Sequence, residues 1–446
     1  MNKKFITRFA PSPTGLLHVG NTRTALINYL LALKEDGKFI LRIDDTDKER
    51  SKDEFINQIK QDLEWLEINF QEIFKQSERL TCYNENFEKL KEKGLIYPCF
   101  EDPEELERKR KRLIERRKPP VYDRAALNLS QNEIAKLIDK GKKPYWRFKL
   151  SSKRVIFNDL VRGEVKVETS AQSDPVIKRE DGGYLYNLPS VVDDIDMGIT
   201  HVVRGEDHVT NSAIQVEMFQ ALDKPVPIFA HHPLLVNENG EPFSKRNAAS
   251  SVKSLREKYL NPIAINSLNI SIGTSIDLRP IYSMKEMAEN FDIGALGRAP
   301  ARYSEKQLLK LNSMIVSSLS FLQLSDDFKE LGYDINEDIW ECIKNNIETL
   351  TEVKEWLKII KGPIKNDNKL DSEFMRIVEK LLPEEPWDET TWEKWVSKIK
   401  ERTKKIGKDL FLPLRRAITG KSNGPELNKL IILIGYKEIR NRLKNN

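Results

Sequence analysis

The sequence predicts an α/β protein in which a parallel-sheet domain is followed by all-helical domains. Three observations lead to this prediction. Near the amino terminus, apolar runs that suit strands alternate with segments of helical periodicity. A loop rich in Pro and Gly joins the first strand to the first helix. From about residue 255 onward, helical periodicity continues to the last residues.

The first four predicted elements form a βαβα series. We expect strands at residues 5–10 and 38–44, and helices at residues 19–34 and 53–66, the second with apolar side chains near helical spacing. Such a series predicts a parallel sheet with helices on its faces. Ligands of these sheets bind beyond the carboxyl ends of the strands, where the loop 11–15 lies.

The charge pattern and the predicted secondary structure of the chain change near Pro98. Residues 104–118 predict a helix of mixed charge that contains the basic run 108–112. Further segments predict strands at residues 144–150, 155–157, 165–167 and 184–188. We expect the first sheet to resume near Tyr186, to include residues 201–204 and 228–231, and to be followed by a turn at 237–240.

Composition bounds the class of protein. The 446 residues allow about three domains, and the net charge of +5 says little about partners. From Lys400 onward, however, thirteen Lys or Arg face four Asp or Glu, which suits a polyanion or a solvated helical face. The three cysteines are odd in number and widely spaced, which favours a cytoplasmic protein without disulfides. We find neither a signal-peptide pattern nor an apolar run of membrane-spanning length.

Two short segments predict a phosphate site. The loop 11–15 leads into a helix, whose first N–H groups and positive dipole end would point at a ligand in the loop. Residues 243–246 (FSKR) form a small loop, from which Lys245 could reach the same phosphates. Together they indicate a site that activates a substrate with ATP.

These segments carry a resemblance to a known family. Residues 18–21 (HVGN) and 243–246 resemble the HIGH and KMSKS signatures of class I aminoacyl-tRNA synthetases. Six further motifs, in order along nearly the whole chain, resemble bacterial glutamyl-tRNA synthetases: 8–15 (RFAPSPTG), 41–47 (LRIDDTD), 191–194 (VVDD), 203–208 (VRGEDH), 299–302 (APAR) and 411–420 (FLPLRRAITG).

The resemblance implies a domain plan. It expects a Rossmann-like catalytic domain in two halves, an inserted α+β domain that binds the tRNA acceptor end, a stem-contact region with the KMSKS-like loop, and an α-helical anticodon-binding domain. The corresponding residues are 1–97 and 185–235, 98–184, 236–325, and 326–446. Related glutamine enzymes use β-barrels as anticodon readers, so helical texture favours the glutamate branch.

The resemblance also implies a reaction. The α-carboxylate of glutamate attacks the α-phosphate of ATP, and a ribose hydroxyl at the tRNA 3′ end then takes the acyl group. Such chemistry needs positioning and charge neutralisation. His18 would donate to a phosphate oxygen, although a helix-capping or packing role is the alternative. Lys245, with Ser244, would stabilise the transition state. The implied ATP-binding residues are Thr14, Gly15, His18, Gly20, Asn21, Leu235 and Lys245.

For the amino acid, the site must hold two carboxylates and one ammonium group. Guanidinium groups bind carboxylates in a bidentate manner. The resemblance assigns the side-chain carboxylate to Arg8 with Tyr186, the α-carboxylate to Arg204, and the ammonium group to Asp44. Ala10, Ser12 and His208 would complete the pocket. The alternative for both arginines is ordinary pairing with Asp or Glu.

The sequence departs from the family at several places, among them Asp44, where relatives often have the longer Glu. Pro242 stands where a Lys is usual and Ala248 where a Gly is usual, which puts the rate of activation in doubt. Many relatives bind zinc through a Cys-x-Cys and a later pair, but here Cys99 keeps only one thiolate. We therefore expect no zinc, Cys99 as a small buried side chain, and Mg²⁺ held mainly by ATP phosphates and water.

The resemblance implies a glutamate–tRNA ligase, with L-glutamate, ATP and tRNA(Glu) as partners and a monomer as the assembly. Its alternative is glutamylation of tRNA(Gln), alone or in addition; a non-catalytic tRNA-binding relative or a truncated paralogue that modifies a tRNA base fits less well. The basic run 108–112 could touch RNA or face solvent. Trp387, Trp392 and Trp395 could stack on anticodon bases, though core packing is the favoured role.

Overall fold

The computed structural model describes residues 4–241, 243, 251–364 and 370–444. Their contacts divide the chain into two compact units. Unit 1 contains residues 1–255 and 265–304, and unit 2 contains residues 256–264 and 305–446. Lys245, Ser244, Pro242 and Ala248 lie outside the described residues.

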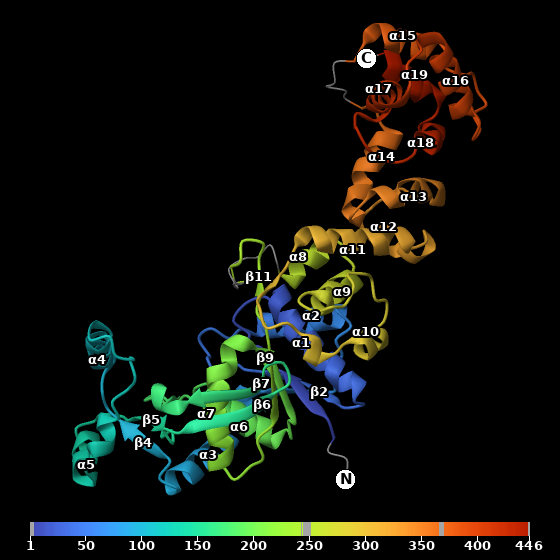
Figure 1. The fold of residues 1–446 in the computed structure, drawn as a ribbon. Helices are drawn as coiled ribbons and strands as arrows, with labels where there is room; N and C mark the ends of the chain where they lie inside the picture. Colours follow the sequence, from blue (N-terminus) through green and yellow to red (C-terminus); the bar gives the residue numbers. More distant parts are fainter. Residues whose placement is uncertain (1–3, 242, 244–250, 365–369, 445–446) are drawn as a thin grey trace. The chain divides into compact units, whose positions relative to one another are not determined.

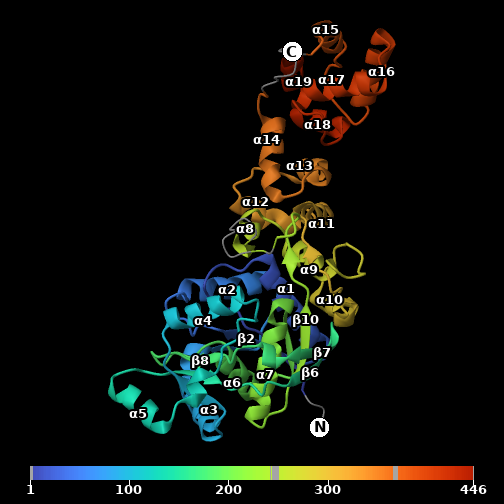
Figure 2. The same cartoon turned by 60° about the vertical axis from the view of Figure 1, so that its left-hand side comes forward.

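Unit 1 is built on a mostly parallel sheet (Figures 1 and 2). One part has the strand order β1-β2-β3, and the other has the order β7-β6-β10-β9. The two parts meet where the backbone N–H of Thr200, just before β9, donates to the carbonyl of Ile6 in β1 at 3.0 Å. The strands are β1 Ile6–Phe9, β2 Lys38–Ile43, β3 Glu72–Lys75, β6 Arg154–Asp159, β7 Gly163–Glu168, β9 His201–Gly205 and β10 Ile228–His232.

Helices pack on this sheet because their sequences are apolar where they face it. Helix α1 (Val19–Lys34) packs on β1, β2 and β9, and buries Leu26, Ile27 and Leu30. Its Asn28 amide also donates to the carbonyl of Val203 in β9. The remaining helices of unit 1 are α2 Asp53–Trp65, α3 Leu80–Glu92, α4 Pro103–Glu115, α5 Gln131–Asp139, α6 Asn187–Asp196, α7 Val209–Ala221 and α10 Met284–Asn290.

A second, antiparallel sheet has the order β4-β5-β8, with bounds β4 Ile96–Cys99, β5 Tyr145–Phe148 and β8 Val176–Lys178. It lies with α4 and α5 inside the predicted insertion (Figure 1). Strands β6 and β7 also fall in the predicted insertion, yet β6 pairs with β10 of the main sheet. The domain boundaries stay predictions. A short ladder pairs β11 Leu235–Val236 with β12 Ala301–Arg302.

Unit 2 is helical and has one large apolar core. That core includes the fully buried Trp340 and Trp395. Helix α17 carries most of the last motif and is capped by Gly420, whose φ of 73° suits glycine and whose N–H donates to the Arg416 carbonyl. The helices are α11 Glu305–Ser318, α12 Ser325–Glu330, α13 Glu337–Ile343, α14 Val353–Lys361, α15 Ser372–Lys380, α16 Thr391–Thr403, α17 Gly407–Thr419, α18 Leu427–Ile434 and α19 Tyr436–Lys444. Helices α8 (Val252–Glu257) and α9 (Pro262–Ser271) include the places where the chain passes between the units.

Most predicted elements are confirmed and one is wrong. The predicted helix 19–34 has the observed bounds, and helical structure dominates after residue 255. The strand expected at 184–188 is wrong: Tyr184 makes one isolated bridge to Lys178, and helix α6 begins at Asn187. Helix α6 buries seven of its residues and packs against α3 and α7, so tertiary packing overrides the local strand pattern.

Candidate active site

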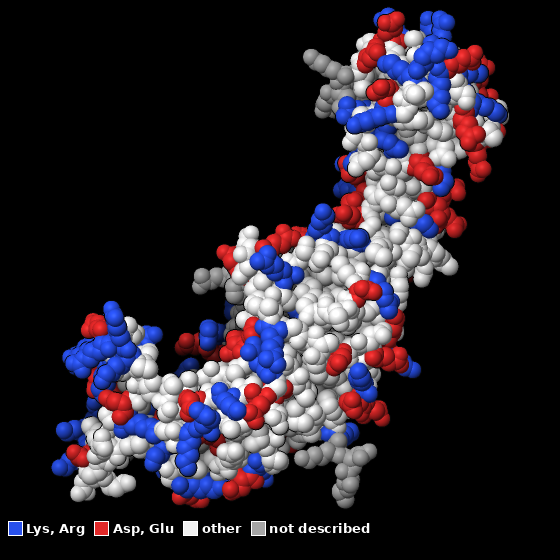
Figure 3. Space-filling view, in the orientation of Figure 1, with Lys and Arg blue, Asp and Glu red and all other residues white. Residues whose placement is uncertain are grey.

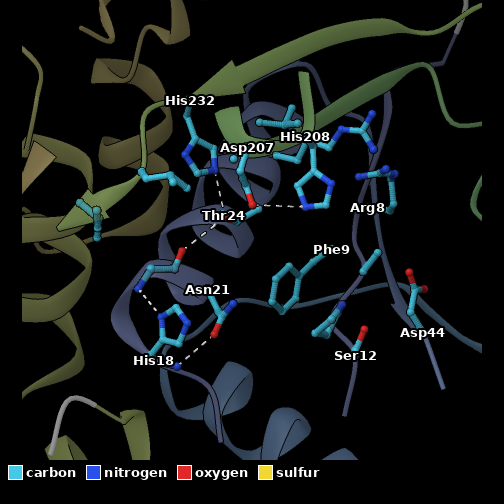
Figure 4. Close-up of a pocket in the computed structure, with 18 of the residues that line it drawn as sticks. Arg8, Phe9, Ser12, His18, Asn21, Thr24, Asp44, Asp207, His208 and His232 are labelled. Atoms are coloured by element: carbon cyan, nitrogen blue, oxygen red, sulfur yellow. Dashed lines mark hydrogen bonds and ion pairs between the residues drawn. The ribbon is translucent and has the colours of Figure 1, made fainter. Parts of the chain in front are cut away.

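A pocket of about 490 Å³ opens where β1 and β9 end, beside the first turn of α1 (Figure 4). This is the place where the strand order reverses direction in unit 1, since β2 and β3 extend from β1 while β10 and β6 extend from β9. Its lining residues are Arg8, Phe9, Ala10, Pro11, Ser12, His18, Gly20, Asn21, Thr24, Arg42, Asp44, Tyr186, Val203, Arg204, Gly205, Asp207, His208, His232, Leu234, Leu235 and Phe243.

At one end of the pocket, His18 is the N-cap of α1. Its Nδ1 accepts the backbone N–H of Gly20 at 3.1 Å, and its own N–H donates to Asn21 Oδ1 at 3.2 Å. Because Nδ1 acts as an acceptor, the ring proton of the neutral imidazole is on Nε2. The capping alternative and the predicted donor role are therefore compatible, since capping makes Nε2 the donor of this ring.

Gly20 is required by the position of that ring. A Cβ added at residue 20 would lie 3.0 Å from His18 Cε1 and 3.1 Å from His18 Nδ1. Such contacts are tighter than ordinary packing, so a larger side chain would press the imidazole out of its capping position.

A second imidazole lies deeper at this end. The Thr24 hydroxyl lies 2.9 Å from His232 Nε2, and His232 Nδ1 lies 3.1 Å from the Pro233 carbonyl. A carbonyl only accepts, so Nδ1 carries the proton and Nε2 accepts from Thr24. Burial lowers the pKa of His232 to about 4, which keeps the ring neutral.

The residues that flank the second signature lie beside His18. The Phe243 ring stacks near the His18 ring with centroids 6.3 Å apart. Ser251, on the other side of residues 244–250, forms a β-bridge with His18. The described residues on either side of the second signature loop, Phe243 and Ser251, therefore lie beside the start of α1.

The other end of the pocket is rich in buried charge. Arg8 pairs with both carboxylate oxygens of Asp194, at 3.0 and 3.3 Å. Arg42 pairs with both oxygens of Asp44, at 2.7 and 3.1 Å, and reaches Asp194 at 2.8 Å. Burial outweighs the Arg42 guanidinium and raises the pKa of Asp44 to about 6.

Arg204 differs from these arginines in the nature of its partners. Its guanidinium donates to Tyr186 Oη at 2.9 Å, Ser212 Oγ at 2.5 Å and Gln215 Oε1 at 2.8 Å, and Nε lies 3.4 Å from His231 Nε2. None of these groups is a carboxylate. Burial lowers the pKa of Arg204, but an arginine remains charged at neutral pH.

Tyr186 and His208 close this end. Tyr186 Oη lies 3.3 Å from His208 Nδ1. Burial and, to a smaller extent, the nearby Arg204 guanidinium lower the pKa of His208 to about 4, so this ring is neutral.

The chain matches the family model for class I tRNA synthetases (E and Q), catalytic domain, over residues 4–310. An anticodon-binding-domain model matches residues 321–446. This chain is a class I tRNA synthetase of the E and Q family. The site just described is the candidate active site of this synthetase.

The synthetase is similar to curated and solved relatives along nearly its whole length. It is 45% identical to a glutamate–tRNA ligase 1 from Parvibaculum lavamentivorans and 45% identical to a glutamate–tRNA ligase 2 from Beijerinckia indica, each over 98% of both chains. A crystal structure of a glutamate tRNA ligase from Elizabethkingia meningosepticum in complex with its amino acid has a TM-score of 0.85, with 26% identity and 99% coverage of both chains.

The pocket brings together most of the predicted site residues of the synthetase. Those that line it are Arg8, Ala10, Ser12, His18, Gly20, Asn21, Asp44, Tyr186, Arg204, His208 and Leu235. Thr14 and Gly15 are not among the lining residues, while Ser244 and Lys245 lie outside the described residues. The functional role of each residue stays a prediction.

Sequence reasoning missed several residues that build the site. Arg42 and Asp194 are in two of the quoted motifs, 41–47 and 191–194, but their pairing with Asp44 and Arg8 was not foreseen. Thr24 and His232 were also missed. Their signal is weak, because only strand register and helix packing bring them together.

The segment around Cys99, for which we predict no zinc, contains a compact hydrogen-bonded cluster. Tyr122 Oη donates to Glu101 at 2.6 Å, Tyr145 Oη donates to the same carboxylate at 3.2 Å, and Cys99 Sγ lies 3.8 Å from Tyr122 Oη. Cys99 is buried as predicted, and burial raises its pKa to about 11. In the described part of the chain, no group of three or more His, Cys, Asp or Glu could hold a metal. The absence of zinc stays a prediction.

Other surface predictions have mixed outcomes. The basic run 108–112 lies on α4, which buries none of its side chains, and Figure 3 shows Lys and Arg gathered there. Trp395 is fully buried, and Trp387 and Trp392 pack against the same core, which confirms the favoured packing role. Among the described residues, no helix has the length and apolar character that a membrane crossing needs. A cytoplasmic location stays a prediction.

Proposed function

We propose that this synthetase is a glutamate–tRNA ligase, which uses ATP to join L-glutamate to tRNA(Glu) and releases AMP and diphosphate. The observation that carries the proposal is its 45% identity, over 98% of both chains, to relatives named glutamate–tRNA ligases. The charge of the pocket supports the choice of amino acid.

The arginines at the amino-acid end are not all paired in the same way. Arg8 and Arg42 pair with aspartates, whereas the described partners of Arg204 are all neutral. A carboxylate of the substrate would therefore pair with the buried Arg204 guanidinium in a site where charge is poorly screened. The second carboxylate of glutamate could pair with a guanidinium in a bidentate manner, whereas the neutral side-chain amide of glutamine could not.

We assign each charged group of glutamate to one side chain of the site by comparing the contacts that these side chains already make. Arg204, whose described partners are neutral, would bind the α-carboxylate. Arg8, with Tyr186 nearby, would bind the side-chain carboxylate with the face that Asp194 leaves open. Asp44, ionised above pH 6, would accept the ammonium group.

ATP would lie at the opposite end. The first turn of α1 presents backbone N–H groups and its dipole to phosphates, and His18 Nε2–H would donate to a phosphate oxygen. We expect Mg²⁺ to accompany ATP, where it would neutralise phosphate charge. The glutamate α-carboxylate oxygen then bonds to the α-phosphorus while the bond to diphosphate breaks. In the second step, the tRNA ribose oxygen bonds to the carbonyl carbon and AMP leaves.

The test is charging of purified tRNA(Glu) and tRNA(Gln) with labelled glutamate, ATP and Mg²⁺. Charging of tRNA(Glu) is the expected result. Additional charging of tRNA(Gln) would make the enzyme non-discriminating, and charging of tRNA(Gln) alone would contradict the proposed tRNA. Light scattering of the same sample would test the expected monomer.

Lys245→Ala tests the second signature in the same assay. We expect it to abolish adenylate formation but to leave tRNA binding intact. The matched control is Lys285→Ala, which removes an exposed lysine from α10. Unchanged adenylate formation in Lys245→Ala would contradict the role of this lysine.

A further inference from the structure

A chain of buried side chains leads from Arg204 away from the pocket to a carboxylate. Arg204 Nη2 donates to Ser212 Oγ at 2.5 Å, Ser212 Oγ lies 2.7 Å from His231 Nε2, and His231 Nδ1 lies 2.5 Å from Asp159 Oδ2. Each of the four residues is at most 6% exposed. The last three are not among the residues that line the pocket.

The strand register makes this chain possible. On adjacent parallel strands, Arg204 of β9 is the direct Cα partner of His231 of β10. On the other side of β10, Asp159 is the last residue of β6 and pairs with Phe229. Ser212 comes from helix α7. Three neighbouring strands and one helix therefore fix the four side chains.

The hydrogen bonds have one consistent direction. Asp159 Oδ1 accepts the backbone N–H groups of Val161 and Arg162, and Oδ2 accepts the backbone N–H of His231. Burial opposes ionisation, but these bonds and the His231 imidazole outweigh it and hold the pKa of Asp159 below its usual value. An ionised carboxylate only accepts, so His231 carries its proton on Nδ1.

His231 then accepts at Nε2. Burial lowers the pKa of His231 despite the Asp159 carboxylate, so the ring is neutral. The Ser212 hydroxyl has two possible acceptors, His231 Nε2 at 2.7 Å and the His208 carbonyl at 3.2 Å. The shorter distance favours His231, which leaves a Ser212 lone pair to accept from Arg204.

The order Asp–His–Ser has the form of a hydrolytic triad, but this serine is not a nucleophile. Ser212 is 0% exposed, and its Oγ lies against the Arg204 guanidinium. No substrate carbonyl could reach it, and the adjacent cation would hold its lone pair.

We propose that Asp159, His231 and Ser212 are positioning residues that orient Arg204 toward the α-carboxylate of the amino acid, an inference that rests on the proposed function. The relay supports the guanidinium without neutralising it directly. Arg8 is paired with Asp194 itself, whereas the neutral side chains of Ser212 and His231 lie between Arg204 and the carboxylate of Asp159. The charge of Arg204 is thus left for the substrate.

The test is the steady-state charging of tRNA(Glu) by Asp159→Asn. The amide oxygen would replace Oδ1, which accepts two N–H groups, so the NH₂ group would face His231 Nδ1. His231 would change tautomer, and Nε2–H would no longer accept from Ser212. We expect the KM for glutamate to rise about tenfold, with the KM for ATP changed less than about twofold.

Glu217→Gln is the matched control. Glu217 is also a buried carboxylate, on the same helix α7, and accepts from Ser151 and Thr169 without touching the relay. This control should lower the unfolding midpoint to a similar extent but leave the KM for glutamate unchanged. Ser212→Ala, a smaller change, should raise that KM about threefold, and a fluorophosphonate probe should not label Ser212.

Several results would overturn the relay while leaving the proposed function intact. These are a glutamate KM in Asp159→Asn no higher than in Glu217→Gln, an equal rise in the KM for ATP, or phosphonate labelling of Ser212. Failure of the unmodified enzyme to charge any tRNA with glutamate would instead contradict the proposed function itself.

Discussion

The two ends of the pocket use opposite means of binding. The amino-acid end is a network of buried charges in which Arg8 and Arg42 already pair with aspartates. The end at α1 relies on imidazole rings and backbone groups: His18 Nδ1 accepts a backbone N–H, and both nitrogens of the neutral His232 ring have local partners. The contrast indicates that the first end would select its substrate through pairing with individual charged side chains, whereas the second would bind polyphosphate through backbone dipoles and one directed donor.

This difference gives the two ends different sensitivities. A charge network loses much when one member is removed, since a buried partner is left uncompensated. A site made of backbone groups and neutral donors loses less when one side chain changes. Substitutions should therefore separate the two ends by the substrate whose kinetics change and by the size of the change.

Arg204→Ala should have the largest effect. It removes a buried guanidinium whose described partners are all neutral, so no other described group replaces its charge toward the α-carboxylate. We expect kcat/KM for glutamate to fall at least about 100-fold, or about 2.7 kcal/mol, with little change in the KM for ATP. Steady-state charging assays at varied glutamate and ATP would measure both. An equal loss for both substrates would break the division between the two ends.

Gly20→Ala should reduce the rate about tenfold, since the new methyl group would lie about 3 Å from the His18 ring and displace its donor. The effect should be on kcat and on the KM for ATP, not on the KM for glutamate. Glu35→Ala, at the other end of the same helix, is the control. Wild-type kinetics in Gly20→Ala would mean that the capped position of His18 does not matter.

The pH dependence sharpens the comparison further. Burial raises the pKa of Asp44 to about 6. Asp44, the proposed partner of the substrate ammonium group, is therefore ionised above pH 6 and becomes protonated as the pH falls below 6. We expect the KM for glutamate to rise several-fold between pH 7 and pH 5.5. His232 at the ATP end and His208 at the amino-acid end both have pKa values near 4 and should contribute nothing in this range. A KM for ATP that follows the same curve would contradict the assignment to Asp44.

Thr24→Val should have the smallest effect. It removes the hydroxyl that lies 2.9 Å from His232 Nε2 while keeping the volume of the side chain. A neutral hydrogen bond of this kind contributes about 1 kcal/mol, so the KM for ATP should change about three- to fivefold. The KM for glutamate should stay the same, and a larger change in it would show that His232 acts on both ends.

The sequence predicted local structure better than the pairing of charges. Helix α1 follows from its capping residues and apolar spacing, and the lining role of Arg8, Asp44 and Arg204 was expected from the motifs. The link between Arg8 and Asp194 spans 186 residues, and the relay from Arg204 to Asp159 depends on the register of three strands. Neither periodicity nor turn chemistry contains that information.

The wrong prediction of a strand at residues 184–188 also arises because long-range packing is not contained in the local sequence. The segment 184–188 has β-like composition, but Tyr186 immediately precedes helix α6, which buries Asp193 and Asp194 beside Arg42 and Arg8. The need to bring these carboxylates to the arginines overrides local propensity.

The position of β6 bears on how far parts of this enzyme could be exchanged. Asp159 lies inside the chain segment expected to hold the acceptor end, yet β6 pairs with β10 and its last residue completes the support of Arg204. A chimera that took residues 98–184 from another synthetase would therefore also replace part of the amino-acid site. A transplant that keeps residues 151–169 of the host would preserve the amino-acid site. The part of this segment that can be exchanged is therefore the small sheet β4-β5-β8, without the β6–β7 hairpin.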